Sequence, residues 1–382
     1  MTCYLRRSIA GLHTLLIGMA VALAAAPARG DVTITEIAAP SGVIAADVGA
    51  LNDAGTVVLR SSSQNWIRHP NGTYEPVVPP PGFTSTFLGR INESGSVVGS
   101  ATIGQTTARA VIRRANGTYV FPVSGNDTLA IGINDAGTVV GTDRTVVPWR
   151  QFVWREGGGV TFVPQPPGAQ QNAVSYLVGI NNGETIIGST SVPPPVPQPG
   201  TGISRGFRHT SAGGSVLLPT TGSDPTEAAD INDAGVIVGT VGGLGSDIRP
   251  AKWLADNTLV ELVPPRPSGI VVAQGINSLG DIVGHGPIAG FRAILWSDDF
   301  GSVDLNELLS PDQRSHWLLR LAFDINDNRQ VIGSGHFDPD GPGGPALPEN
   351  RLFLLNLPPI PEPMLGLFML PALALRRRAH RG

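Results

Sequence analysis

Seven copies of one short pattern occupy the middle of this sequence and constrain its fold more than any other feature. The clearest copy reads Ile-Asn-Asp-Ala-Gly-Thr-Val-Val-Gly at 133–141. Its Asn recurs at intervals of 40 to 51 residues, at Asn52, Asn92, Asn134, Asn181, Asn232, Asn277 and Asn326. The fifth and sixth residues after each Asn are Val or Ile in all seven copies, and the next residue is Gly in six. A period of this length predicts repeated supersecondary units.

Each copy has the chemistry of a tight hairpin that leads into a returning strand. The Asn side chain can close an Asx-turn, and Gly three residues later supplies a positive φ in five copies. Two copies depart from this pattern, with Gly183 one residue early and Asn328-Arg329 in place of Ala-Gly. The β-branched pair then begins the second strand, because branched side chains favour extended backbone.

A third and a fourth strand complete the unit. The third strand begins near an Arg in six copies, at Arg109, Arg150, Arg205, Arg249, Arg292 and Arg351. In the first two copies, Asn71-Gly72 and Asn116-Gly117 make a second hairpin into the fourth strand. Four strands in about 45 residues are typical of a propeller blade. The sequence therefore predicts an all-β fold, a seven-bladed β-propeller of four-stranded blades.

The ends of the repeat region predict how the ring closes. The last copy lacks a fourth strand, because its third strand at 351–357 runs directly into the C-terminal tail. A spare strand at 32–38 (Val-Thr-Ile-Thr-Glu-Ile-Ala) precedes the first Asn hairpin. We expect this N-terminal strand to pair with 351–357 and close the ring, since closure removes exposed sheet edges.

The joined motif resembles the extracellular HAF repeat, named for a His-Ala-Phe in its third strand. The Asn-Asp-Ala-Gly-x-Val-Val-Gly half matches well, whereas Arg replaces the His in six copies. The resemblance covers nearly all of 45–357. It implies an exported repeat protein and no catalytic residue.

The N-terminus has the features of a secretory signal. Arg6 and Arg7 precede an apolar stretch from Leu12 to Ala26, and Ala26-Pro27-Ala28 supplies small residues for cleavage. We therefore assign 1–28 to a signal peptide and 29–358 to the propeller. Cys3, the only cysteine, lies in the segment expected to be removed, so the mature chain would have no thiol chemistry.

The C-terminus, 359–382, predicts sorting and anchoring. Pro361-Glu362-Pro363 is followed by an apolar run and then by Arg376, Arg377 and Arg378. An apolar run before a basic cluster places the cluster on the cytoplasmic side. This order resembles the PEP-CTERM sorting signal, which implies an exosortase-type membrane protease as a processing partner. The run of 12 residues is shorter than the roughly 20 of a full span, so cleavage and retention both stay open.

Charge and residue types exclude several function classes. Between the two ends, 19 basic and 29 acidic residues give a net charge of -10. An acidic body disfavours nucleic acid as a partner. The His residues are scattered and predict no zinc site. Gly202-Ile203-Ser204-Arg205-Gly206 matches Gly-x-Ser-x-Gly, but it precedes a strand rather than a helix, so we expect no nucleophile elbow. We expect no cofactor.

Three other features each have a structural and a functional interpretation. Asp338-Pro339-Asp340-Gly341 could hold calcium, although we expect a solvated loop. Trp154, Trp253 and Trp296 share one repeat position and could stack sugars, although we favour packing between blades. The Asn-Asp turn residues could bind metal, but turn chemistry already explains them.

Chain direction places the six strand-three arginines on one face, together with the longest loops. Variable loops on a rigid scaffold are where binding evolves, and a ring of Arg could attract an acidic polysaccharide. This hypothesis requires exposed, unpaired guanidinium groups. We rank higher the alternative that each Arg pairs with an acid or carbonyl of the neighbouring blade.

We therefore predict an exported, surface-associated, non-catalytic propeller that binds extracellular polymer or cell-surface ligands. The alternative is a polysaccharide lyase or hydrolase on the same scaffold. Carboxylates restricted to one or two blades at the channel would favour the enzyme, and similar residues from many blades would favour binding.

Overall fold

A computed structural model describes residues 31–38, 47–61, 64–104, 107–194, 202–243, 248–266, 269–288 and 290–358. The predicted signal peptide (1–28) and the predicted sorting tail (359–382) both lie outside the described residues. Within these ranges, no helix has both the length and the apolar character needed to cross a membrane.

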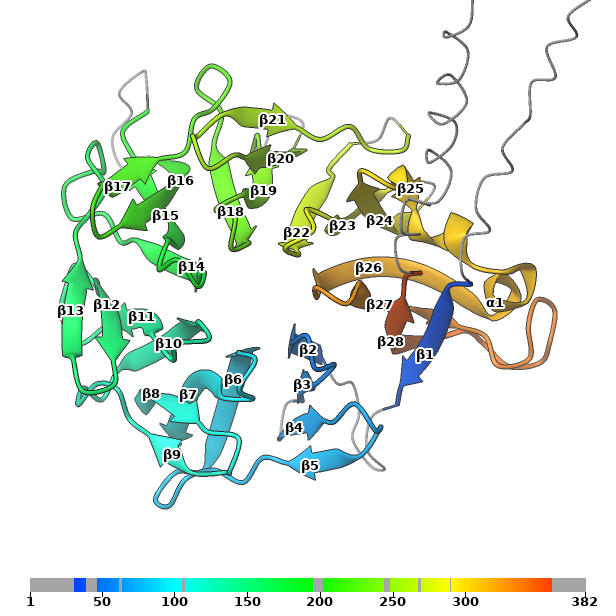
Figure 1. The fold of residues 1–382 in the computed structure, drawn as a ribbon, viewed down its shortest axis with the longest axis horizontal. Coiled ribbons are helices and arrows are strands. Elements are labelled where there is room, and N and C mark those ends of the chain that lie inside the picture. Colours follow the sequence, from blue (N-terminus) through cyan, green and yellow to red (C-terminus); the bar gives the residue numbers. More distant parts are fainter. Residues whose placement is uncertain are drawn as a thin grey trace, which may run out of the picture. The chain divides into compact units, whose positions relative to one another are not determined.

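Residues 31–358 form a seven-bladed β-propeller, as predicted (Figure 1). The innermost strands, a, are β2 (Asp47–Leu51), β6 (Ser85–Ile91), β10 (Thr128–Ile133), β14 (Tyr176–Ile180), β18 (Thr226–Ile231), β22 (Val272–Ile276) and β26 (Trp317–Ile325). The b strands are β3 (Val57–Arg60), β7 (Val97–Ile103), β11 (Val139–Asp143), β15 (Ile186–Val192), β19 (Ile237–Val241), β23 (Ile282–Pro287) and β27 (Gln330–Phe337). The c strands are β4 (Asn65–Arg68), β8 (Thr107–Arg113), β12 (Arg150–Arg155), β16 (Ile203–Thr210), β20 (Arg249–Trp253), β24 (Phe291–Ser297) and β28 (Glu349–Asn356). The outer d strands are β5 (Tyr74–Pro76), β9 (Tyr119–Val120), β13 (Gly159–Val163), β17 (Gly214–Leu217), β21 (Leu259–Glu261), β25 (Gly301–Asp304) and β1 (Thr33–Ile37).

The N-terminal strand closes the ring as predicted. β1 pairs antiparallel with β28, from Thr33 opposite Asn356 to Ile37 opposite Leu352, and supplies the outer strand of the last blade. Ile37 is 2% exposed and packs in the core between the last and first blades. The first and last blades are therefore held together by the two ends of the folded chain.

The paired Val or Ile residues explain how the blades pack. Successive side chains of a strand point to opposite faces of its sheet. In the second blade, Val97 enters the core shared with the first blade, whereas Val98 enters the core shared with the third. The same division holds for the other six pairs, so seven cores form a closed circuit. All fourteen side chains are at most 3% exposed.

The Asn hairpins form as predicted and make a second circuit. The Gly three residues after Asn52, Asn92, Asn134, Asn232 and Asn277 has a φ between 76° and 85°, and in the two departing copies Glu184 and Arg329 take positive φ instead. Each Asn Oδ1 accepts the backbone N–H four residues later. Each Nδ2 donates to the backbone carbonyl of the next blade's Asn, at 2.9–3.2 Å, and Asn326 donates to Asn52.

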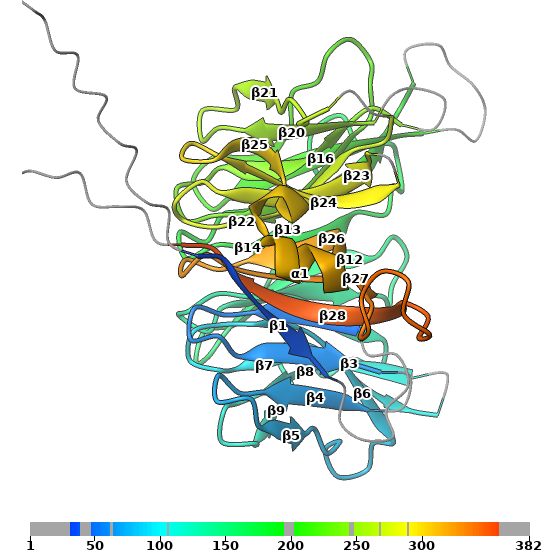
Figure 2. The same cartoon turned by 90° about the vertical axis from the view of Figure 1, so that its right-hand side faces the viewer.

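The two faces of the ring differ because of chain direction. We call the face that carries the a–b and c–d hairpins the Asn face, and the face that carries the b–c and d–a connections the loop face. Figure 2 shows the blades edge-on, with the loop that follows β27 projecting on one side. A connection between the sixth and seventh blades contains a short helix, α1 (Pro311–His316), and a 3₁₀ turn (Leu305–Leu308), neither of which the sequence analysis predicted.

Candidate functional site

A β-bulge at one repeat position shapes the central channel. In every blade the a–b pairing shifts register at the residue three before the Asn, for example between Leu88 and Arg90. The bulge brings the a-strand backbone close to the repeat Gly: a Cβ on Gly99 would lie 1.9 Å from the carbonyl oxygen of Phe87. This close approach explains Gly after the Val pair in six blades, whereas the first blade carries Leu59 there despite the same register shift.

The residue two before each Asn belongs to the channel wall. This position holds Ala50, Arg90, Gly132, Gly179, Asp230, Gly275 and Asp324. Ala50, Arg90, Gly132, Gly179, Asp230 and Asp324 line a cavity of about 160 Å³, together with neighbouring residues of the a strands. Four of the seven positions carry a small residue, and three carry a charge. Repetition thus sets the geometry of the channel, while its charges come from three blades only.

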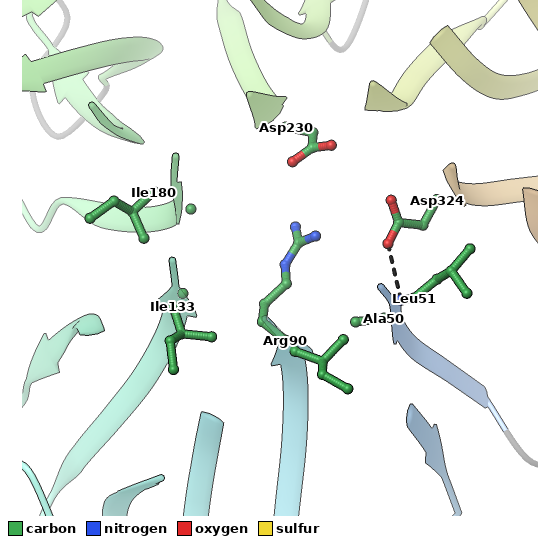
Figure 3. Close-up of a pocket in the computed structure, with 10 residues that line it drawn as sticks. Ala50, Leu51, Arg90, Ile133, Ile180, Asp230 and Asp324 are labelled. Carbon is green, nitrogen blue, oxygen red and sulfur yellow. Dashed lines mark hydrogen bonds between the residues drawn. The ribbon is translucent and has the colours of Figure 1, made fainter. Parts of the chain in front are cut away.

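The three charged side chains converge across the channel (Figure 3). The Arg90 side chain of β6 extends toward the space between Asp230 of β18 and Asp324 of β26. All three keep partial solvent contact. Among the described residues, no ion pair within 4.0 Å joins Arg90 to either carboxylate. The guanidinium therefore faces both carboxylates across open space.

Each carboxylate also accepts backbone N–H groups. Asp324 Oδ2 accepts from Leu51 of the first blade at 3.3 Å, and its Oδ1 accepts from Ile325 at 2.9 Å. Asp230 Oδ2 accepts from Ile276 of the sixth blade at 3.1 Å. These bonds join each acidic blade to the next one. They fix the carboxylates in place and leave lone pairs directed to the channel.

The enclosure of the carboxylates changes their protonation. Desolvation and the nearby negative charge of Asp230 raise the pKa of Asp324 to about 7, against a smaller opposing effect of Arg90. Desolvation also raises the pKa of Asp230, and Arg90 again opposes it. Two desolvated carboxylates that repel each other across one cavity titrate as a pair. The channel therefore holds an exchangeable proton near neutral pH.

A wider funnel lies toward the loop face and meets the channel cavity at Arg90. Its volume is about 350 Å³, and its wall includes Arg60, Phe87, Arg90 and apolar residues such as Ile131 and Val178. Phe87 is 58% exposed, and the Arg60 guanidinium lies 4.7 Å from its ring centroid. Arg60 is held by Asp47 at 2.7 Å and by the carbonyl of Val48 at 3.1 Å. An exposed aromatic ring beside fixed cations is an arrangement suited to stacking and hydrogen bonding of polar ligands.

The six strand-three arginines are not a ring of free cations. Five make ion pairs or carbonyl contacts: Arg150 with Asp143, Arg205 with the Leu218 carbonyl, Arg249 with Asp224 and Glu261, Arg292 with Asp304, and Arg351 with Glu36 and Glu349. The guanidinium of Arg109 stacks 4.6 Å from the Phe121 centroid. The partners lie in the same blade or its connecting segment, not in the neighbouring blade as expected. Most of these guanidinium groups are therefore not the unpaired cations that the ligand hypothesis requires, and ligand binding by the ring stays a prediction.

The remaining sequence candidates also have structural roles. Trp253 and Trp296 are 0% and 6% exposed, and each donates its Nε1–H to a carbonyl of the preceding connection. Trp154 packs against the same kind of core. Ser204 lies inside β16, so no nucleophile elbow forms. In the loop after β27, Asp338 and Asp340 accept backbone N–H groups of that loop.

Sequence reasoning missed the charged channel residues. Arg90, Asp230 and Asp324 occupy a position that the repeat leaves unconstrained, so no motif marks them. One sequence signal could have found them. The residue two before each Asn is charged in three copies and is Gly or Ala in the other four.

Comparisons with known proteins support the fold alone. No protein-family model matches the chain, and no curated protein matches it. Among solved structures, a streptogramin B lyase aligns with a TM-score of 0.50 at 13% identity, over 86% of this chain and 98% of that one. Virginiamycin B lyase from Staphylococcus aureus aligns with a TM-score of 0.50 at 10% identity, over 86% and 99%. An acylaminoacyl peptidase from Pyrococcus horikoshii aligns with a TM-score of 0.50 at 12% identity, over 80% and 50%.

Proposed function

We propose that this protein is an exported, surface-displayed propeller that binds extracellular polymer without acting on it chemically. The observation that carries the proposal is the funnel on the loop face, where the exposed ring of Phe87 lies beside Arg60 and Arg90. Sugar rings stack on aromatic side chains, and guanidinium groups bind hydroxyls or carboxylates of the same chain. A ligand inserted here would meet apolar walls and fixed donors together.

The positions of the folded chain's ends support display of this funnel. Thr33 lies opposite Asn356, so the chain enters and leaves the propeller at the Asn face of the last blade. Both ends of the described propeller therefore lie on the face opposite the funnel.

Export and processing have a direct test. Mass spectrometry of protein released from the cell surface should find no peptide from 1–28 and none from 376–382. An intact Arg376 to Gly382 peptide outside the cell would contradict processing of the tail. Protein confined to the cytoplasm would contradict the proposal as a whole.

Binding is tested by exposing the full chain to a panel of neutral and acidic polysaccharides. Phe87→Ala should weaken binding about 5- to 150-fold, because loss of one stacked ring costs about 1–3 kcal/mol by analogy with other aromatic stacking. Phe162→Ala is the matched control: Phe162 is 47% exposed but lies on an outer strand, β13, and should bind normally. If both variants lost binding affinity equally, or if the unaltered chain bound none of the polysaccharides, the funnel would not be a polymer-binding site.

A polysaccharide-acting enzyme is the second candidate, and one observation favours it. Asp230 and Asp324 are carboxylates from two blades that meet at the channel, and the pKa of Asp324 is raised to about 7. A carboxyl group with such a pKa suits general acid–base catalysis at neutral pH. We rank this candidate second because both carboxylates already bind neighbouring blades. New reducing or unsaturated ends, lost in Asp324→Asn, would reverse the ranking.

A further inference from the structure

The channel cavity contains a guanidinium that no described residue satisfies. Arg90 reaches between Asp230 and Asp324, yet no hydrogen bond or ion pair joins it to any described residue. A charged group in a narrow protein cavity loses part of its hydration, and this cost is offset only by a partner. The Arg90 guanidinium is therefore available to donate hydrogen bonds to a group that enters the cavity.

The propeller does not need these charges in order to close. The same repeat position holds Ala50, Gly132, Gly179 or Gly275 in the other four blades, and the Asn circuit and the seven cores continue through those blades without change. Uncharged residues at this position are thus compatible with the fold. A purely structural role explains the backbone contacts of the two carboxylates and uses Arg90 as their counter-charge. It does not account for the hydrogen-bond donors that Arg90 presents to the cavity.

Size and charge together define the class of ligand. The channel cavity has a volume of about 160 Å³. Cavities of about 150 Å³ engineered into other proteins bind benzene, so this cavity has room for roughly six non-hydrogen atoms. On one wall, the Arg90 guanidinium can donate two parallel hydrogen bonds to a carboxylate. On the other wall, Asp230 and Asp324 can accept hydrogen bonds from an ammonium group. A divalent metal ion matches this site poorly, because the guanidinium would repel it.

We propose that the channel binds a small zwitterion of amino-acid size, with its carboxylate on Arg90 and its ammonium group between Asp230 and Asp324. The funnel gives access from the loop face, and its apolar residues Ile131 and Val178 can accommodate a side chain. The inference does not depend on polymer binding. The two sites share Arg90 but differ in ligand and in the other residues that each requires.

Titration calorimetry of the full chain with glycine, β-alanine and γ-aminobutyrate tests the site. At least one should bind with one-to-one stoichiometry and a Kd below about 1 mM, a binding free energy of about 4 kcal/mol. Acetate carries only the negative group of the zwitterion and methylammonium only the positive group. Each should bind at least about tenfold more weakly. Arg90→Met and Asp324→Asn should each weaken zwitterion binding at least about tenfold.

Two controls separate binding from folding and from general charge. Asn at 324 keeps one acceptor oxygen, for the Leu51 or the Ile325 N–H but not for both. The variant loses one local hydrogen bond and should still keep a cooperative thermal transition. Asp135→Asn removes an exposed carboxylate at an Asn hairpin, outside the channel, and should bind like the unaltered chain. Loss of binding in Asp135→Asn to the same degree would overturn the assignment to the channel.

Proton release gives a readout that a structural role would not affect. An ammonium group beside Asp324 favours the ionised carboxyl, so binding near pH 7 should release protons, and the heat should vary with the ionisation enthalpy of the buffer. Asp324→Asn should abolish this dependence. No binding by any of the three zwitterions, equal binding by acetate, or tighter binding of Ca²⁺ would each overturn the proposal, whatever the outcome with polysaccharides.

Discussion

At the scale of single residues, the repeat Gly after each Val pair has a steric role that a substitution can test. Gly239→Ala would place a Cβ 1.9 Å from the carbonyl oxygen of Glu227, which belongs to a bulged strand. Because backbone must move to relieve this contact, we expect a loss of about 3 kcal/mol in the free energy of unfolding, measured with urea.

Gly269→Ala is the matched control for this prediction. Nothing lies within 4 Å of a Cβ at Gly269, and its φ is not positive. The free energy of unfolding should change by no more than about 0.5 kcal/mol. If Gly239→Ala were equally mild, the close approach of the bulged strand would not be the reason for the repeat Gly.

Asp324 should make stability depend on pH in a predictable direction. Its pKa is about 7 in the folded protein against 3.8 as the ordinary value, so the folded state keeps a proton that the unfolded chain releases near pH 4. The stabilisation is complete below about pH 4 and is lost as the pH rises through 7. The groups that face it are Asp230, which raises its pKa, and Arg90, which lowers it.

Thermal unfolding between pH 4.5 and 8.5 checks this expectation. Asp324→Asn cannot ionise, so its melting temperature should fall less with rising pH, and the variant should gain stability relative to the unaltered chain toward pH 8. Parallel pH profiles for the two proteins would show that Asp324 has an ordinary pKa.

At the scale of elements, β1 is the strand whose removal should affect the whole ring. Ile37 is 2% exposed in the core between the last and first blades. We expect Ile37→Ala to cost about 2–5 kcal/mol, the usual range for truncating a buried aliphatic side chain. Thr35→Ala, at an exposed position of the same strand, should cost much less. Similar losses in chemical unfolding would mean that β1 contributes pairing but no core.

The blades could be predicted from sequence because each one is encoded by the same local chemistry. Asn and Gly specify the hairpin, and the Val pair requires two apolar environments on opposite sides of a sheet. The connection at 305–316 could not be found in this way, because it occurs once and follows helix rules. Its Ser310 and Gln313 form a capping box, a local helix signal that is unrelated to the repeat motif.

The candidate site was less predictable for a related reason. The strand-three arginines recur in six blades, and four of them make ion pairs within their own blade or its connecting segment. Function in a symmetric scaffold depends on departures from the repeat. Arg90, Asp230 and Asp324 are such departures, and only the structure brings blades two, five and seven to one axis.

At the scale of the whole molecule, the Asn residues join the blades into one closed system. Each side chain satisfies its own hairpin and bonds to the next blade, and the bond from Asn326 to Asn52 spans the two ends of the sequence. In an open solenoid the Nδ2 of the last Asn would lack its inter-blade acceptor. Its counterpart, the first Asn carbonyl, would keep only the N–H three residues later. In the closed ring all seven inter-blade bonds form.

Asn134→Ala tests how much this circuit contributes to the stability of the propeller. The change removes the bond from Nδ2 to the Asn181 carbonyl at 3.2 Å and the bond from the Thr138 N–H at 2.9 Å, both of which are buried. The Thr138 N–H would lose its partner, whereas the Asn181 carbonyl would keep the N–H of Glu184 at 3.0 Å. We therefore expect a loss of about 2 kcal/mol in the free energy of unfolding.

Asn116→Ala is the control, since Asn116 also accepts a nearby N–H in a hairpin but is exposed and bonds to no other blade. It should cost about 1 kcal/mol or less, because the Thr118 N–H it leaves can bond to water. Asn326→Ala should match Asn134→Ala, since the closing bond is equivalent to the others, and both should unfold in a single transition. Losses no greater than that of Asn116→Ala would show that the seven hairpins are independent turns, and that the inter-blade cores alone close the ring.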